Sequence, residues 1–161
     1  MKKKKTSAGI AIVWNKKLLL VHPTNNKWWG TYGIPRGGLE KNETPFDAAI
    51  RETKEETGIS VPVSKIDKNE KTVFSKRKTV VYYILEIDNL SEIGLSSEVV
   101  PKNQLQIEEV DWAGFVDLKE ARKRMLSYQH DILNVLVNKG LLESSMSTLL
   151  DFNSYEKKYI K

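Results

Sequence analysis

GGLEKNETPFDAAIRETKEETGI, residues 37–59, contains a helix whose two ends are both marked in the sequence. Thr44 is a good N-cap, Pro45 suits the first helical position, and Asp47 stands three residues after the cap. Gly58 supplies a left-handed stop at the other end. We therefore predict a helix between Thr44 and Gly58, entered from a glycine-rich loop.

The two faces of this helix differ in chemistry. At about 100° per residue, the apolar side carries Phe46, Ala49, Ile50, Thr53 and Thr57. The other side carries three carboxylates at spacings i, i+3 and i+4, namely Glu52, Glu55 and Glu56. Like charges at these spacings repel by about 0.2–0.5 kcal/mol per pair. The set is suited to holding Mg²⁺, which prefers oxygen ligands, and an acidic solvated surface is the alternative interpretation.

The loop before the helix strengthens the first interpretation. It reads Ile34-Pro35-Arg36-Gly37-Gly38, and a glycine backbone can approach a ligand or metal closely. Arg36 is suited to clamping a phosphate. A structural turn would explain the loop by itself. Loop, cap and carboxylates together favour a site for a metal and a phosphorylated ligand.

At this point the residues resemble a known family. Gly37, Glu43, Arg51-Glu52, Glu55-Glu56 and Gly58-Ile59 match the Nudix box, G-x5-E-x7-R-E-U-x-E-E-x-G-U, where U is a bulky apolar residue. Thr53 departs from the first U position, although its methyl group can still pack. The resemblance to Nudix hydrolases implies an α/β fold, an α/β/α sandwich with a mixed central sheet.

The same resemblance implies a reaction and a set of roles. Water would cleave a diphosphate linked to another moiety, with Mg²⁺ or Mn²⁺ as cofactor. The metal ligands would be Glu52, Glu55, Glu56 and the carbonyl of Gly37. Arg51 is expected to orient the glutamates, and Glu43 to brace the loop against the helix.

The residue that acts as general base varies within the family. We assign it to Glu52 and keep Glu109 as the rival. Glu109 follows Glu108, and a solvated loop pair is the alternative interpretation of these two residues.

Segments outside the box are loosely similar to the diadenosine-tetraphosphate hydrolase group of that family. They are residues 28–38, 78–85, 109–112, 117–121 and 126–128. An adenine ring would stack on an aromatic side chain and a polyphosphate would contact cations. The aromatic candidates are Tyr83 and Tyr128. The cationic candidates are Arg36, Lys76, Arg77 and Lys78. A core position for Tyr83 and a plain hairpin loop for residues 76–78 are the alternatives.

The predicted function is therefore cleavage of a diphosphate linkage in a nucleoside or dinucleoside polyphosphate. Other hydrolase hypotheses are removal of pyrophosphate from an RNA 5′ end, clean-up of damaged nucleoside triphosphates and cleavage of diphosphoinositol polyphosphates. A non-catalytic nucleotide-binding module is the hypothesis from a different class. The intact carboxylate set argues against it, because mutual repulsion serves no purpose without a cation.

The rest of the chain is read as one domain. Apolar, β-branched runs predict strands over residues 8–14, 18–22, 79–87 and 106–115. Residues 24–38 read as a loop, and residues 117–125 and 129–138 as helices. We expect the hydrolase domain to cover residues 1–140, with 141–161 as a tail or extra helix of the same domain.

Composition narrows the chemistry further. The 161 residues include no cysteine and two histidines, His22 and His130, so any metal is expected to have oxygen ligands. The 26 basic and 21 acidic residues leave a net charge of +5, which is compatible with a phosphorylated partner. No apolar run reaches the roughly 18–20 residues of a membrane span. We expect a cytoplasmic monomer or homodimer that does not bind membranes.

Overall fold

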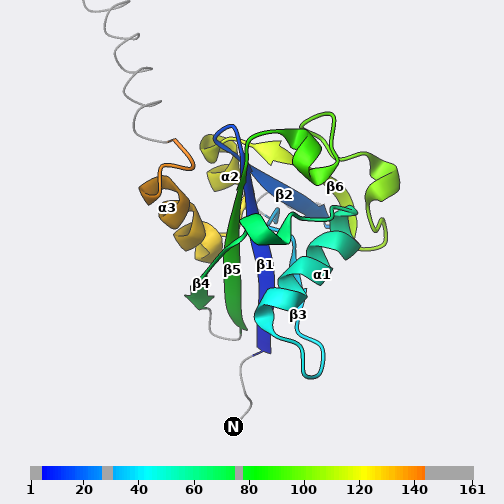
Figure 1. Ribbon diagram of the computed structural model, residues 1–161, viewed down its shortest axis with the longest axis vertical. Coiled ribbons are helices and arrows are strands. Elements are labelled where there is room, and N and C mark those ends of the chain that lie inside the picture. Colours follow the sequence, from blue (N-terminus) through cyan, green and yellow to red (C-terminus); the bar gives the residue numbers. More distant parts are fainter. Residues whose placement is uncertain (1–4, 27–30, 75–77, 144–161) are drawn as a thin grey trace, which may run out of the picture.

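The computed structural model describes residues 5–26, 31–74 and 78–143, which form a mixed sheet with helices on both faces (Figure 1). The strands are β1 (Lys5–Trp14), β2 (Lys17–Pro23), β3 (Arg36–Gly38), β4 (Asp67–Phe74), β5 (Lys78–Ile87) and β6 (Val110–Val116). The helices are α1 (Pro45–Thr57), α2 (Leu118–Arg124) and α3 (His130–Asn138). Short 3-10 turns occupy Val63–Lys65, Leu90–Ile93, Lys102–Gln104 and Ser127–Gln129.

The strand order in the sheet is β4-β5-β1-β2-β6, and β3 pairs with β1 beside this path. The central pair, β1 and β5, is parallel over its whole length, whereas the other pairs are antiparallel. The predicted mixed sheet is therefore confirmed. Because β3 pairs with β1 through Ala8 and Gly37, the glycine-rich loop is fixed to the centre of the sheet.

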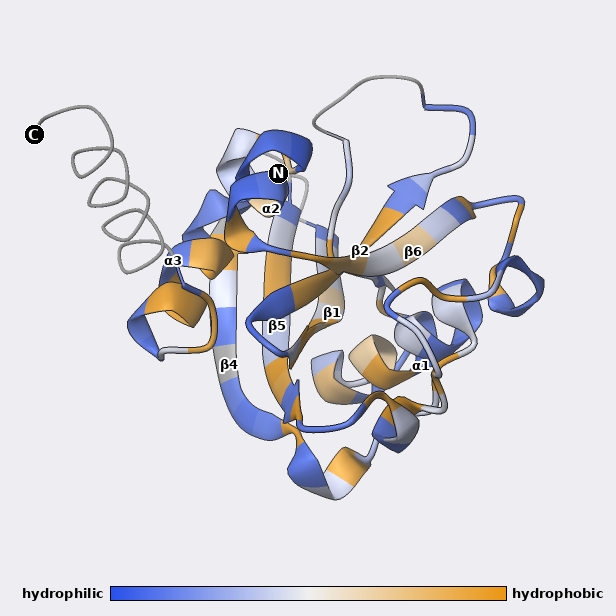
Figure 2. Ribbon diagram, turned by 90° about the horizontal axis from the view of Figure 1, so that it is seen from above, coloured by the Kyte–Doolittle hydropathy of each residue, from blue (hydrophilic) through white to orange (hydrophobic). Residues whose placement is uncertain are grey.

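Two hydrophobic cores lie on opposite faces of the sheet because side chains alternate along each strand. On β1, Ile10 and Ile12 face the core under α1, and Ala11 and Val13 face the core under α2 and α3. Figure 2 shows α1 on one side of the strands and the other two helices across from it. The α/β/α sandwich predicted from the sequence is confirmed.

The β1–β2 hairpin closes through two residues with positive φ, Asn15 at 50° and Lys16 at 60°. Two central residues in this region define a type I′ turn, whose twist matches that of the flanking strands. The turn joins the two strands that were predicted over residues 8–14 and 18–22.

The structure differs from the sequence prediction in three strands. β4 was not predicted because its sequence, DKNEKTVF, is mostly polar, as is common on an edge strand. β3 lies inside the predicted loop 24–38 and is too short to show a pattern. β6 begins at Val110, because residues 107–109 form a turn, so the predicted start at 106 is wrong.

The packed core reaches past residue 140, since Leu142 is 2% exposed and contacts the α2–α3 core. Within the described residues, every helix is too short or too polar to cross a membrane.

Candidate active site

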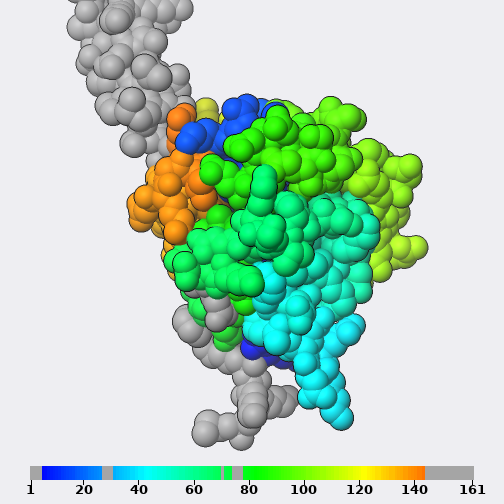
Figure 3. Space-filling model, viewed as in Figure 1, coloured from blue at the N-terminus to red at the C-terminus, as the bar shows by residue number. Residues whose placement is uncertain are grey.

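Helix α1 begins and ends where its sequence signals predict. The Thr44 hydroxyl accepts a hydrogen bond from the backbone N–H of Asp47 at 3.1 Å. At the other end Gly58 has φ 73° and donates its N–H to the carbonyl of Lys54. Thr53, at the departure from the box pattern, is fully buried and its hydroxyl donates to the Ala49 carbonyl. Arg51 and Glu52 of this helix contact Gly38 and Gly37 of β3. Figure 3 shows the residues near position 40, between β3 and α1, in cyan.

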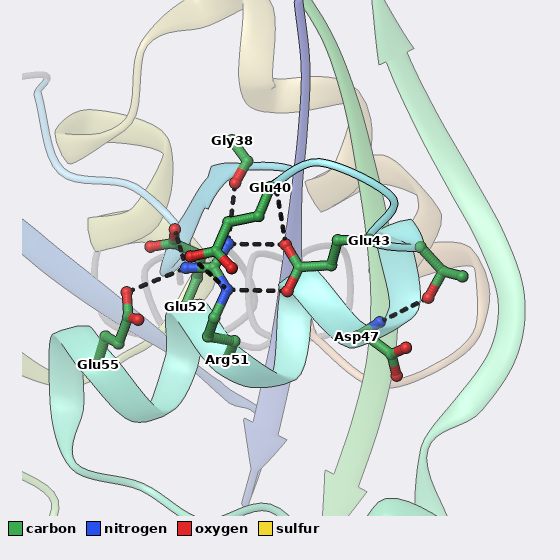
Figure 4. A network of polar contacts seen from close by, with 8 residues as sticks. Gly38, Glu40, Glu43, Asp47, Arg51, Glu52 and Glu55 are labelled. Atoms are coloured by element: carbon green, nitrogen blue, oxygen red, sulfur yellow. Dashed lines mark hydrogen bonds and ion pairs between the residues drawn. The ribbon is translucent and has the colours of Figure 1, made fainter.

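Arg51 links the loop to the helix through several hydrogen bonds (Figure 4). Its guanidinium donates twice to Glu43 at 2.8 Å and once to the backbone carbonyl of Gly38 at 3.0 Å. It also donates to Glu52 at 2.9 Å and to Glu55 at 3.1 Å. One guanidinium therefore holds three carboxylates and the loop backbone in fixed relative positions. The pairs with Glu52 and Glu55 agree with the expected orienting role of Arg51, and the part of this network in catalysis stays a prediction.

The ion pairs of this network shift the pKa values of the side chains that form them. The hydrogen bond from Arg51, followed by one from the Glu40 backbone, lowers the pKa of Glu43 to about 2. The hydrogen bond to Glu43 in turn raises the pKa of Arg51. Glu43 therefore stays ionised at every pH at which the protein would work.

Position 37 has room only for glycine, because the Glu52 carboxylate lies against the Cα atom of Gly37. A Cβ atom at position 37 would stand 2.1 Å from Cδ of Glu52 and 2.3 Å from both carboxylate oxygens. No side chain fits there. The glycine and the glutamate are thus brought into contact across the junction of β3 and α1, as their shared assignment to the metal site requires.

Glu56 is the buried carboxylate of the set, with 8% of the residue exposed. The backbone N–H of Arg36 hydrogen-bonds to it, yet its Oε2 atom has no hydrogen-bond partner. Burial, followed by the charges of Glu52 and Glu109, raises the pKa of Glu56 to about 8. Burial likewise raises the pKa of Glu52, against the effect of Arg51. Arg51 therefore neutralises part of the charge of Glu52 and Glu55, whereas Glu56 is the buried carboxylate that keeps an unpartnered oxygen.

A pocket of about 380 Å³ opens beside Glu56. Glu109 also lines it, as do the cationic side chains Arg36 and Lys78. Its apolar lining includes Val21, Ile34, Val110 and Leu126. Carboxylates for a cation, cations for phosphate and apolar walls for a ring are thus combined in one pocket.

Arg36 and Tyr128 meet inside this pocket. The Nη2 atom of Arg36 donates to the Tyr128 hydroxyl at 2.9 Å, and Nε2 of Gln129 donates to the same hydroxyl at 3.1 Å. The Nη1 atom of Arg36 and Oε1 of Gln129 are buried without a hydrogen-bond partner. Polar atoms in this condition are costly to bury and are commonly satisfied by a ligand or water.

The donor set fits a hard divalent cation in its chemistry. Glu52, Glu55, Glu56 and the Gly37 carbonyl offer only oxygen, and the Glu56 Oε2 atom lacks a partner. In the part of the chain that the structure describes, no three acidic or histidine side chains already converge on one metal position. Arg51 hydrogen-bonds to Glu52 and Glu55, whereas Glu56 accepts its hydrogen bond from the backbone N–H of Arg36.

The structure corrects one substrate-binding prediction. Tyr83 is 4% exposed and packs edge-on against Phe46 of α1, with ring centroids 5.1 Å apart. It belongs to the core under α1, so the prediction that it stacks on a base is wrong. Arg36, Lys78 and Tyr128 do line the pocket, whereas the two cations predicted at positions 76 and 77, Lys76 and Arg77, lie outside the described residues.

Gln129 is a pocket residue that the sequence reading missed. It is 2% exposed and stands at the N-terminus of α3. A signal was present, because Gln129 precedes Ile132, Leu133 and Leu136 at helical spacings i, i+3, i+4 and i+7. A polar residue on an otherwise buried apolar stripe marks a position that requires a hydrogen-bond partner.

The fold and the box helix are those expected of the family that the sequence resembles. A comparison of the sequence with family models gives the same family. The NUDIX domain model matches residues 3–134, so the chain belongs to the NUDIX domain family.

Individual relatives extend this finding. The mRNA-decapping enzyme subunit 2 of Saccharomyces cerevisiae is 32% identical over 133 residues, which are 81% of this chain and 12% of the yeast protein. The asymmetrical bis(5′-nucleosyl)-tetraphosphatase of Mus musculus is 33% identical over 92 residues, 53% of this chain and 63% of the mouse protein. The chain thus spans about an eighth of the length of the yeast relative.

A solved structure supports the fold. A bifunctional NMN adenylyltransferase/ADP ribose pyrophosphatase from Francisella tularensis, complexed with AMP and a Mn ion, superposes with a TM-score of 0.63. The match covers 86% of this chain and 42% of that one, at 21% identity. At this identity the likeness concerns the fold.

Proposed function

We propose that the chain is a divalent-cation-dependent hydrolase that cleaves a diphosphate linkage in a nucleoside or dinucleoside polyphosphate. The observation that carries the proposal is Glu56, a buried carboxylate with an unpartnered oxygen, in one pocket with Arg36 and Lys78. A site that concentrates negative charge needs a cation, and adjacent positive side chains suit the phosphates that such a cation binds.

Glu52, Glu55, Glu56 and the Gly37 carbonyl would hold Mg²⁺ or Mn²⁺. When bound, such a cation neutralises phosphate charge and lowers the pKa of a coordinated water. Arg51 holds Glu52 and Glu55 in position, and Glu43 fixes Arg51 against the loop. The Francisella structure, which carries a Mn ion, supports a divalent cation in this fold.

Glu52 is our choice for the residue that accepts the proton of the attacking water. Its carboxylate is held by Arg51 and rests against Gly37, so its position is well defined. Glu109 remains the rival, because it lines the pocket from a different segment and its charge acts on Glu52 and Glu56.

Arg36 and Lys78 would bind phosphate groups of the substrate, and the apolar pocket lining would cover a ring. The name of the mouse relative supports a dinucleoside tetraphosphate as substrate. The yeast relative is named for mRNA decapping and matches 81% of the chain, so the 5′ end of an RNA is the second candidate.

One panel experiment tests the function and separates the substrates. Diadenosine tetraphosphate, capped RNA, 5′-triphosphorylated RNA, ADP-ribose and nucleoside triphosphates are each incubated with Mg²⁺ or Mn²⁺, and the products are identified by mass. We expect turnover of at least one member and a loss of orders of magnitude in Glu56→Gln, because a charged ligand is removed while the shape is kept.

The matched control is Glu108→Gln, since Glu108 is an exposed carboxylate in the turn beside the pocket. It should leave turnover unchanged. Retained turnover in Glu56→Gln, or full turnover in excess chelator, would exclude the proposed site.

A further inference from the structure

The Tyr128 hydroxyl has an unusual set of neighbours. It accepts hydrogen bonds from Nη2 of Arg36 at 2.9 Å and from Nε2 of Gln129 at 3.1 Å. A phenol oxygen has one proton to donate and a limited capacity to accept. Two donors already point at the hydroxyl oxygen, so the hydroxyl can contact a ligand by donating its own proton.

The surroundings make this proton a strong donor. Burial raises the pKa of Tyr128, but the hydrogen bonds from Gln129 and Arg36 and the charges of Arg36 and Lys78 outweigh it, so the pKa is lowered overall. A more acidic phenol gives a stronger hydrogen bond to an anion. Gln129 is the N-cap residue of α3, so this helix begins beside the Tyr128 hydroxyl. A helix N-terminus carries partial positive charge.

The ring of Tyr128 is less available than its hydroxyl. The guanidinium carbon of Arg36 lies 6.0 Å from the ring centroid, and the ring packs against the core under α2 and α3. The hydroxyl is therefore the better placed group for contact with a ligand in the pocket that Tyr128 lines.

The remaining polar atoms of the cluster indicate the charge of that ligand. Nη1 of Arg36 is a buried donor that lacks a hydrogen bond of good geometry, although the guanidinium interacts with the buried Tyr82 hydroxyl, and Lys78 lines the same pocket. Two cations and a polarised hydroxyl form a set of donors that suits an anion rather than the edge of a neutral base. Glu56 and Glu109 lie at the same pocket, where the proposed cation would neutralise them.

We propose that Tyr128 binds the substrate through its hydroxyl, as hydrogen-bond donor to an oxygen of the polyphosphate chain, and that Gln129 is a positioning residue that orients this hydroxyl. The proposal rests on the proposed function for the identity of the natural ligand. It replaces base stacking, which the sequence suggested for Tyr128, with a role in phosphate recognition.

Gln129 suits the positioning role because it is 2% exposed and its amide donates a hydrogen bond to the hydroxyl at 3.1 Å. Its own Oε1 atom is buried and has no partner, so this residue maintains its place at an energetic cost. Such a cost is typical of functional sites rather than of ordinary core packing.

Binding without catalysis tests the proposal. Inorganic tripolyphosphate and adenosine are titrated separately into the full chain by calorimetry at low salt, once with chelator and once with Mg²⁺, which would neutralise Glu56 and Glu109 in the same pocket. Tyr128→Phe keeps the ring and removes the hydroxyl. We expect it to weaken tripolyphosphate binding about tenfold or more, the loss typical of a hydrogen bond to a charged group. Adenosine binding should be unchanged. Tyr83→Phe removes a phenol hydroxyl in the opposite core and should leave both titrations as in the wild type.

Gln129 is tested through a double-mutant cycle, because a positioning residue acts only through its partner. Gln129→Leu should weaken tripolyphosphate binding, and adding it to Tyr128→Phe should cause no further loss. Additive losses would indicate a structural role and overturn the assignment of Gln129. Thermal unfolding of each variant shows that the fold is intact, and if Gln129→Leu does not fold, Tyr128→Phe still decides the main proposal.

Other outcomes overturn the proposal. Undiminished tripolyphosphate binding in Tyr128→Phe, or no binding by the wild type, excludes the phosphate role. Weaker adenosine binding in Tyr128→Leu but not in Tyr128→Phe would restore base stacking. Failure here is distinct from failure of the proposed function. If the substrate panel is hydrolysed and the hydroxyl is irrelevant, only the subsite is wrong. If tripolyphosphate binds through Tyr128 and nothing is hydrolysed, only the function is wrong.

Discussion

At the scale of single residues, the contact between Gly37 and Glu52 shows how closely the loop and helix are fitted. The Glu52 carboxylate occupies the space that any side chain at position 37 would need. Gly38, one residue later, has open space at the corresponding position, with no atom within 4 Å of a built Cβ. Of these two adjacent glycines of β3, only Gly37 lacks the space for a side chain.

This contrast gives a matched pair of variants. Gly37→Ala would place a Cβ 2.1 Å from Cδ of Glu52, so the carboxylate must move. We expect turnover to fall by at least about tenfold, since misplacing a group by about 1 Å can cost 100-fold. Gly38→Ala should retain turnover. Both are measured on the substrate that the panel identifies, and equal rates for the two variants would contradict the assignment of Gly37 and Glu52 to one site.

Glu56 gives a prediction about pH and stability in the metal-free protein. Its pKa is about 8 in the folded state against 4.5 for the free group, so the folded state binds the proton more tightly. Stability from this group is complete below pH 4.5 and is lost as pH rises through 8. With chelator present, the free energy of unfolding should therefore contain a component that falls between pH 5 and pH 8.

The measurement is urea denaturation at several pH values, for the wild type and Glu56→Gln. The variant has no proton to lose at this position, so its stability should depend less steeply on pH over that window. Parallel curves for the two proteins would show that Glu56 is not the group responsible. Divalent cation should reduce the difference, because it competes with the proton for the same carboxylate.

At the scale of elements, α1 is held at its C-terminal end by a glycine with two separate constraints. Gly58 has φ 73°, and a Cβ there would stand 2.9 Å from the Cβ and from the backbone oxygen of Gln104. Gly94 also has φ 73° and caps the 3-10 turn Leu90–Ile93, but nothing lies within 4 Å of its built Cβ.

The pair separates backbone strain from steric contact. Both alanine variants carry the left-handed strain of about 1–2 kcal/mol. Gly58→Ala adds crowding against Gln104, for which about 1–3 kcal/mol is typical. Urea denaturation should therefore show a larger loss of stability for Gly58→Ala than for Gly94→Ala. Equal losses would indicate that Gln104 moves aside freely.

At the scale of the whole molecule, the two cores use opposite faces of the same strands. β5 sends Tyr82 into the core under α2 and α3, and Tyr83 into the core under α1. The second core is completed by residues after α3, since Leu142 is buried in it. The segment that follows the last described helix is therefore part of the packed domain at least to that residue.

Truncating this residue tests how far the domain extends. Leu142→Ala should lower the free energy of unfolding by about 2–5 kcal/mol, as is usual for a buried leucine. Val63→Ala, at a position that is 43% exposed, should change it by less than about 0.5 kcal/mol. Similar small changes in both variants would mean that Leu142 contributes little to the core.

The sequence alone determined the features that depend on local chemistry. Thr44, Pro45 and Gly58 predicted both ends of α1, because capping is decided within a few residues of chain. The box pattern from Gly37 to Ile59 pointed to the family, and the i, i+4 spacing of Arg51 and Glu55 placed these two residues on one helix face. Apolar, β-branched runs located most strands, but the polar edge strand β4 carried no such pattern.

Only the tertiary structure decided which residues meet across the sheet. Neighbouring residues of a strand face opposite sides, so Tyr82 and Tyr83 must diverge, but only the position of α1 showed that Tyr83 is covered by Phe46. Likewise, Arg36 and Tyr128 are 92 positions apart, and their hydrogen bond exists because β3 pairs with β1 while the chain between α2 and α3 returns to the same pocket. Such contacts depend on how distant segments pack, and no local pattern in a single sequence encodes that.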